Sequence, residues 1–255
     1  MSYDIKRIAS FIIEYSVALL DCGATTIRIE KNVRRIADRY GCECDITILP
    51  MHVLVKLCQK DSGETYSVSQ RTRGTGINYY TNTYLSRLSW RIHDERISLD
   101  EAMEEYQDII SRPRMNKWMV LILVGLANAC FCGLFSGDFI SMLIVFVATI
   151  DGFYIKNKLH ADMHVDIRLA TIVSGTVAAV ISCAGFVYGW GSTPDIALAT
   201  SVLFLVPGIP FINSVSDLIH GHYICCISRF IQATILTICL SLGLCLALLL
   251  MNTEL

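Results

Sequence analysis

The sequence predicts an α-helical polytopic membrane protein with about five transmembrane helices and an N-terminal cytoplasmic α+β domain. The chain of 255 residues is 53% hydrophobic and 17% charged, whereas a soluble domain carries about 25% charged residues. The charges are also unevenly placed, because only four of the 21 Lys and Arg residues follow Trp118. Residues 1–114 are therefore predicted to form the soluble domain and residues 115–255 the transmembrane domain.

The soluble part opens with two amphipathic helices. Apolar residues recur at helical spacing over residues 4–20, with charged residues off that stripe, but the stretch is too short and too charged to cross a bilayer. Thr25 or Thr26 can cap a second helix, and Gly41 fits the position just after its last turn.

The periodicity then changes to that of short strands. Runs rich in Ile, Val and Leu, separated by turn residues, predict a small antiparallel sheet. These runs are residues 45–49, 52–58 and 65–70. Helices resume at about residues 78–94, and Ser98 with Glu101 forms a capping box that opens a last helix ending before Pro113.

Five apolar segments follow, and most approach the ~20 residues needed to cross a bilayer. They lie near residues 118–135, 139–155, 169–188, 196–212 and 230–251. Lys and Arg flank the first segment and otherwise occur only in the second and fourth connections. Since cytoplasmic loops carry an excess of Lys and Arg, the N-terminal domain is predicted to be cytoplasmic, and the fourth segment runs from outside to inside. Asp138 and Asp195 then fall in outer loops and are expected to be solvated.

The fourth apolar segment contains residues that are costly in hydrocarbon. Pro207 and Pro210 each remove a backbone donor, so a helix must break or kink there, and Gly208 lets the backbone approach a ligand. Asn213 and Asp217 share one face of a resumed helix. Because many transporters build their site at a broken helix, these five residues are the predicted translocation site. The alternative is a kinked helix whose Asn213 and Asp217 cap backbone or lie at the cytoplasmic boundary.

Four further residues are candidates for the site. Arg229 can pair with Asp217, either as part of the pathway or as a structural link, and Asp151 either faces the pathway or marks the membrane boundary. Arg28 and Glu30 are two residues apart and cannot form a facing helical pair. In the cytoplasmic domain, Arg28 either pairs across the domain or contacts substrate at the cytoplasmic mouth.

Several other functions find no support in the sequence. The 11 cysteines are scattered and lack metal-ligand spacing, and the stretch from His160 to Asp166 is read as a polar loop, so neither a metal nor a cofactor is predicted. There is no basic-aromatic patch for nucleic acid and no Gly-Lys-Ser/Thr phosphate loop. Energy for transport would then come from an ion, proton or metabolite gradient.

Three stretches together resemble the threonine/serine exporter family. Residues 20–30 contain Gly23-Ala24 followed by Thr26, Arg28 and Glu30, similar to the family's Gly-Ala-x-Thr-x-Arg-x-Glu pattern. Residues 71–102 and the segment from Val206 to Pro210, with its downstream polar residues, extend the resemblance over nearly the whole chain.

The resemblance implies a bacterial inner-membrane exporter of small hydrophilic metabolites. Longer family members carry a second membrane domain, whereas this chain ends at Leu255, just after its fifth apolar segment. It therefore resembles the larger subunit of the two-component type, which exports a dicarboxylate such as succinate, while fused members export threonine and serine. A small polytopic membrane protein would complete the transporter.

Two functions of other classes stay open from the sequence. A membrane-anchored hydrolase would use the soluble domain for chemistry, but that domain has no Gly-x-Ser-x-Gly elbow or other nucleophile motif. A non-catalytic membrane scaffold or sensor would use the domain for interactions. The proline break with its polar neighbours favours transport over both.

Overall fold

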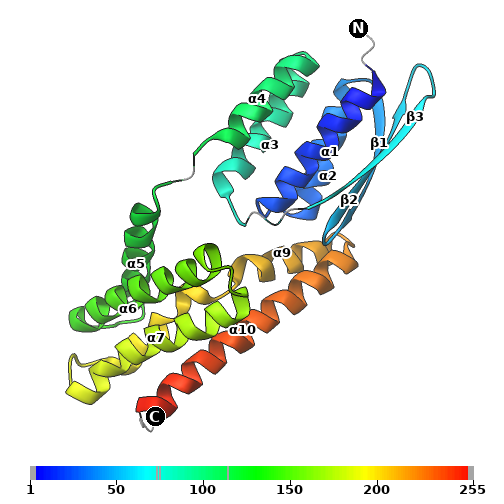
Figure 1. Cartoon of the computed structure of the whole chain (residues 1–255). Coiled ribbons are helices and arrows are strands. Elements are labelled where there is room, and N and C mark those ends of the chain that lie inside the picture. Colours follow the sequence, from blue (N-terminus) through cyan, green and yellow to red (C-terminus); the bar gives the residue numbers. More distant parts are fainter. Residues whose placement is uncertain (1–3, 73, 75, 114, 252–255) are drawn as a thin grey trace. The chain divides into compact units, whose positions relative to one another are not determined.

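The structure, a computed structural model, describes residues 4–72, 74, 76–113 and 115–251 (Figure 1). Its internal contacts divide the chain into two compact units. The first contains Met1–Pro113 together with Ile209–Ile231, and the second contains Arg114–Gly208 together with Gln232–Leu255. The N-terminal segment thus shares its unit with a segment that lies about a hundred residues later in the chain.

The N-terminal segment has the α+β composition that its periodicities predict. Its elements are α1 (Ile5–Asp21), α2 (Thr26–Arg39), β1 (Cys42–Leu49), β2 (His52–Gln59), β3 (Thr65–Arg71), α3 (Tyr79–Asp94) and α4 (Leu99–Ser111). The predicted capping box is confirmed, since Ser98 and the side chain of Glu101 bond reciprocally. Thr25 is the N-cap residue of α2, but its side chain makes no capping hydrogen bond.

The three strands form an antiparallel sheet in the order β1-β2-β3, with β1 and β2 joined by a tight connection at Pro50 and Met51. Side chains of β2 alternate, so that Val53, Val55 and Leu57 are buried while the residues between them are exposed. The buried face packs against α1 and α2. This alternation is the expected signature of a sheet with one face on the core.

A row of polar contacts joins α2 to α3. Arg28 donates to Asn82 Oδ1 at 3.0 Å, Asn32 donates to the hydroxyl of Ser86 at 3.2 Å, and Arg35 donates to the hydroxyl of Ser89 at 2.7 Å. Asn32, Asn82 and Ser89 are buried, so the contacts satisfy polar groups that have left water.

The remaining chain is helical, as expected for membrane spans. Its elements are α5 (Lys117–Leu134), α6 (Phe139–Asn157), the single π-turn η1 (Lys158–Asp162), α7 (Ile167–Tyr188), α8 (Pro194–Ser201), the 3₁₀ turn η2 (Leu203–Leu205), α9 (Gly208–Ile219) and α10 (Tyr223–Met251). Within the described residues, α5, α6 with η1, α7 and α10 are long and apolar enough to cross a membrane. A fifth span results if α8–η2 and α9 together count as one broken span.

The structure contains the predicted break in the fourth apolar segment, because α8 ends at Ser201 and the chain is non-helical at Val206 and Pro207 before α9 starts. Val206 has an extended ψ of 123°, the conformation that a following proline imposes. The last helix starts at Tyr223 rather than near residue 230, so most of the predicted fourth connection is helical.

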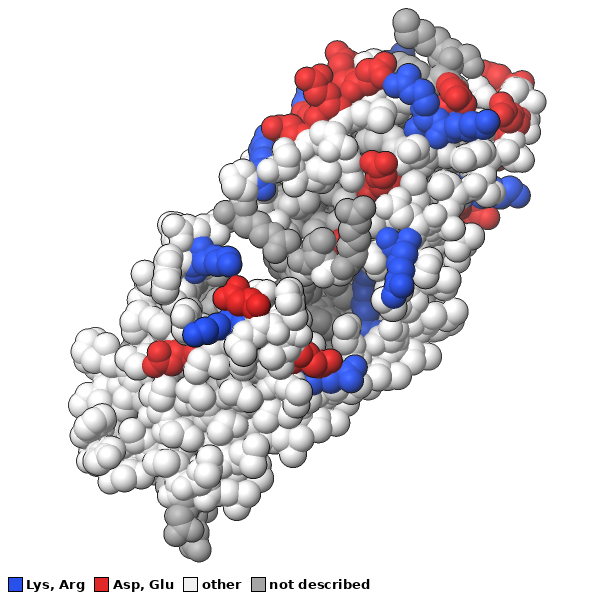
Figure 2. All heavy atoms as spheres, in the orientation of Figure 1, with Lys and Arg blue, Asp and Glu red and all other residues white. Residues whose placement is uncertain are grey.

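Charges and aromatic residues fit a membrane setting for the second unit. Figure 2 shows acidic and basic side chains gathered over the N-terminal segment, whereas the helices that carry the candidate spans are largely uncharged on the visible face. Trp118 stacks on Tyr154, and Tyr188 stacks on Trp190. These pairs lie near helix ends, where aromatic residues mark the two interfaces of a bilayer.

Asp138 is partly exposed, and its carboxylate also binds neighbouring groups of the protein. Its carboxylate accepts hydrogen bonds from the Thr193 hydroxyl at 2.8 Å, the Ser141 amide at 3.2 Å and the Ser192 amide at 3.3 Å. The hydrogen bonds from Ser141 and Thr193, the two largest causes, lower the pKa of Asp138 to about 2. The carboxylate thereby ties the start of α6 to the loop between α7 and α8.

Acidification is therefore expected to release that loop. A carboxyl group whose folded pKa lies below its unfolded value stabilises the fold above pH 4, and this contribution is lost as the pH falls from about 4 to 2. The fluorescence of Trp190, with Trp90 and Trp118 replaced by Phe, should show a transition in this range. Asp138→Asn should lack it, and an identical transition in Asp138→Asn would show that another group is responsible.

Candidate functional site

The helix break leaves an open backbone position beside two prolines. Pro207 is buried, and the Gly208 amide donates to Val206 O at 2.9 Å in a tight bend. Among the residues that the structure describes, no atom lies within 4 Å of the position that a Cβ of Gly208 would occupy. Pro210 falls in the first turn of α9, where its missing N–H has no helical acceptor.

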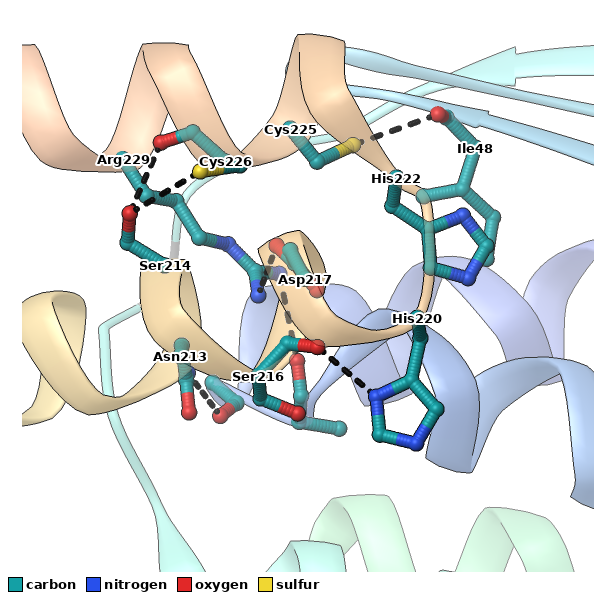
Figure 3. A network of polar contacts seen from close by, with 12 residues as sticks. Ile48, Asn213, Ser214, Ser216, Asp217, His220, His222, Cys225, Cys226 and Arg229 are labelled. Carbon is teal, nitrogen blue, oxygen red and sulfur yellow. Dashed lines mark hydrogen bonds and ion pairs between the residues drawn. The ribbon is translucent and has the colours of Figure 1, made fainter.

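Beyond the break, α9 and the start of α10 form a hairpin that presents a buried polar face (Figure 3). Asn213, Ser214 and Asp217 are the buried residues of α9. The Asn213 amide donates to Gly23 O at 3.0 Å, on the turn between α1 and α2. Gly23 has φ +86°, a conformation that glycine adopts without a Cβ penalty.

The Asp217–Arg229 pair is the centre of this polar face. Arg229 Nη1 lies 2.9 Å from Asp217 Oδ2, and Arg229 Nη2 donates to Ala24 O at 3.2 Å. The side chain of Asp217 is fully buried and that of Arg229 is 16% exposed. The guanidinium therefore links the hairpin to the α1–α2 turn.

One oxygen of Asp217 is unused. Among the described residues, Asp217 Oδ1 is buried and has no hydrogen-bond partner. An unsatisfied buried polar atom costs about 1–3 kcal/mol, and more for a charged group. Proteins typically keep such an unsatisfied atom where it serves a function or binds a water molecule, an ion or a proton.

A second contact joins the hairpin to α2. His222 Nε2 lies 3.5 Å from Glu30 Oε1, with both side chains about one-fifth exposed or less. Nearby, the buried Cys225 thiol donates to Ile48 O at 3.3 Å, and Cys225 belongs to the hydrophobic core of the first unit. His222 lies in the turn between α9 and α10, directly before Tyr223, and no pattern in the sequence indicated its contact with Glu30.

The predicted site residues therefore separate into two groups. Pro210, Asn213, Asp217, Arg229 and Glu30 belong to the first unit, and all but Pro210 meet around the hairpin. The other predicted residues are Pro207, Gly208 and Asp151, which belong to the second unit, and Arg28, which faces α3.

Asp151 is exposed on α6. Its side chain is therefore available to solvent, lipid or another protein on that helix. The candidate stretch around His160 is used locally, since His160 Nδ1 contacts Val165 O at 3.0 Å and His164 has a positive φ of 55°. Within the described ranges, no group of three or more His, Cys, Asp or Glu residues is arranged to hold a metal.

Comparison with known proteins gives three related sequences. The chain is 27% identical over 250 residues to the "Probable succinate transporter subunit YjjP" of Klebsiella aerogenes, covering 95% of this chain and 93% of that protein. It is 29% identical over 247 residues to the Escherichia coli protein of the same name, covering 95% and 94%. It is 22% identical over 251 residues to the "Probable threonine/serine exporter" of Mycobacterium tuberculosis, covering 95% of this chain but 46% of that protein. No solved structure matches.

The family assignment rests on nearly the full length of the chain. Residues 10–251 match the family described as "Putative threonine/serine exporter", and this range includes the broken segment, the α9–α10 hairpin and the α1–α2 turn. The chain therefore belongs to this exporter family, whose members are transporters and not enzymes.

Proposed function

We propose that this chain is one subunit of a secondary exporter that carries a dicarboxylate such as succinate out of the cell across the bacterial inner membrane. The observation that carries the proposal is the buried Asp217–Arg229 pair with its unpartnered oxygen Oδ1. A structural ion pair gains most when every oxygen is satisfied, so the free oxygen supports a working site.

The chemistry of the pair suits a substrate that carries carboxylates. The guanidinium of Arg229 binds carboxylates in fork geometry, so a substrate carboxylate can replace Asp217 as its partner. Asp217, released from Arg229, then takes a proton or a cation on its free oxygen. Exchange of partners at Arg229 makes Asp217 a gate that closes when the substrate leaves.

The comparisons favour succinate over threonine and serine as the first substrate to test. Two relatives that this chain covers over 93% and 94% of their length are named as succinate transporter subunits. The relative named as a threonine/serine exporter is covered over 46%. Threonine or serine remains the second candidate, because an amino acid also presents a carboxylate to Arg229.

The proposed arrangement places the N-terminal α+β domain in the cytoplasm and adds a small polytopic membrane protein as the second subunit. Cytoplasmic placement is supported by Lys156 at the end of α6, Lys158 in η1, Arg168 at the start of α7 and Arg229 in α10. The word "subunit" in the names of two relatives supports a partner.

Efflux from proteoliposomes tests the proposal. The chain is co-purified with its membrane partner, reconstituted, and loaded separately with labelled succinate, threonine and serine. We expect efflux of succinate above that of protein-free vesicles, and a loss of efflux when either subunit is omitted. Absence of flux for all three substrates with the complete pair would reject the exporter, and flux from this chain alone would reject the two-subunit arrangement.

A further inference from the structure

One face of α6 is left uncovered by the residues that the structure describes. Its exposed residues recur every three or four positions, so they lie on one stripe along the helix. The members of this α6 stripe are Ile140, Leu143, Val147, Asp151 and Tyr154. The other side of the helix, with Val145, Ala148 and Thr149 buried, packs against α5, α7 and α8. The stripe is thus one continuous surface on a candidate span.

Asp151 lies on the membrane side of the aromatic residues at the end of α6. Trp118 of α5 stacks on Tyr154 with 6.1 Å between the ring centres, and Lys158 Nζ lies 5.9 Å from the centre of the same Tyr154 ring. Aromatic residues of this kind mark the headgroup level of a bilayer. Asp151 precedes Tyr154 by three residues, which is about 4.5 Å along a helix axis. Because side chains of a helix tilt towards its start, the carboxylate is directed into the apolar part of the stripe.

The carboxylate of Asp151 has no counter-charge on its own helix. Helical side chains meet those three and four residues away, and around Asp151 all four such residues are uncharged. They are Val147, Ala148, Tyr154 and Ile155. In the part of the chain that the structure describes, no hydrogen bond or ion pair involves Asp151. An acidic side chain inside a membrane is costly and is almost always paired, so its partner is expected on another molecule.

We infer that the α6 stripe binds the second subunit, through a transmembrane helix that carries a Lys or Arg opposite Asp151. The apolar residues of the stripe pack against that helix, and the ion pair sets its depth, since polar side chains join helices within membranes. The inference rests on the two-subunit arrangement of the proposed function and identifies the surface at which the two subunits meet.

The charge of Asp151 disfavours two other occupants of the stripe. Lipid chains below the headgroups offer no cation or hydrogen-bond donor to a carboxylate. A second copy of this chain, bound by two-fold symmetry through parallel α6 helices, would place Asp151 beside the Asp151 of that copy. Like charges repel strongly where the dielectric constant is low. A helix with a basic side chain satisfies both the apolar part of the stripe and its carboxylate.

Photocrosslinking in the membrane identifies the occupant of the stripe. A benzophenone amino acid replaces Val147 in the full-length chain, which is produced together with the second subunit, and we expect an adduct with that subunit after illumination. The same replacement at Val173 is the matched control, because Val173 is 44% exposed, against 49% for Val147, but lies on α7. It should form little of this adduct. An adduct with a second copy of the chain, equal adducts from both positions, or no protein adduct at Val147 would overturn the inference.

Charge reversal at Asp151 tests the ion pair. Asp151→Asn should lower the amount of co-purified second subunit about threefold to tenfold, since polar contacts between membrane helices contribute to this extent. Asp151→Lys should lower it further, and changing the opposing Lys or Arg of the second subunit to Asp should restore it. Asp195→Asn removes an exposed carboxylate on α8 and is the control that should leave assembly unchanged. Full assembly of Asp151→Lys would overturn the inference. If Asp151→Lys does not insert, Asp151→Asn decides the question.

The result is separable from the proposed function. An adduct of the second subunit at Val147 without efflux of succinate, threonine or serine would leave the interface standing and reject the exporter. Efflux by the complete pair without that adduct would reject only the interface. Efflux from this chain alone would reject the two-subunit arrangement and the inference with it.

Discussion

Replacing Asp217 by Asn should abolish efflux while the protein still inserts and folds. An Asn side chain keeps an oxygen that accepts from Arg229, so the contact at 2.9 Å can persist. It removes the negative charge and the free carboxylate oxygen, on which the exchange of partners at Arg229 depends. Initial efflux rates from vesicles with matched amounts of protein provide the measurement. Wild-type flux in Asp217→Asn would show that the charge has only a structural role.

Arg229→Met tests how much the Asp217–Arg229 ion pair stabilises the fold, and so complements Asp217→Asn, which tests the role of the negative charge in transport. It leaves the fully buried carboxylate of Asp217 without its cation, and breaking a buried pair in this way destabilises a fold by about 3–5 kcal/mol. We therefore expect a large fall in melting temperature, unlike that of Asp217→Asn. Arg7→Met, which breaks the exposed pair with Asp100, is the control and should have little effect, because exposed ion pairs contribute little.

Gly243→Ala should separate α7 from α10 and destabilise the second unit. A Cβ at Gly243 would lie 2.6 Å from Ile172 O and 3.1 Å from the Thr176 amide, both backbone atoms of α7. Backbone cannot move aside as a flexible side chain can, and overpacking costs about 1–3 kcal/mol or more. Small residues allow such close approach between membrane helices.

Gly175→Ala is the matched control for this contact. Gly175 of α7 also faces α10, but its Cβ would lie 3.5 Å from side-chain carbon atoms of Leu205 and Leu240 and 3.8 Å from Leu240 O, which are ordinary contact distances. Melting in detergent should therefore fall clearly for Gly243→Ala and hardly for Gly175→Ala. Equal effects of the two substitutions would show that helix propensity, and not close packing, accounts for the loss.

The sequence predicted the elements of the N-terminal segment well because their signals are local. Helical spacing, the Ser98 capping box and the alternation in β2 each depend on neighbours within a few residues. The boundaries failed where a polar residue was taken for the end of a helix. Arg229 lies within the first third of α10, where it contacts Asp217 and Ala24 of the first unit.

The candidate site was only half predictable for a related reason. Asn213 and Asp217 were identified from their cost in an apolar segment. The acceptors of Asn213 and Arg229, which are Gly23 O and Ala24 O, lie about two hundred residues earlier. No local pattern specifies such a contact.

The contacts between α2 and α3 have a consequence for axial register. Every partner on α3 lies 54 residues after its partner on α2, so the two helices run parallel, and their dipoles repel rather than cancel. A slip of one turn would break all three hydrogen bonds, as a misaligned polar residue does in a coiled coil. The same register sets where the Asn78 amide meets Cys22 O, at 3.0 Å. Thus a polar seam inside the domain determines the position of the turn that receives Asn213 and Arg229.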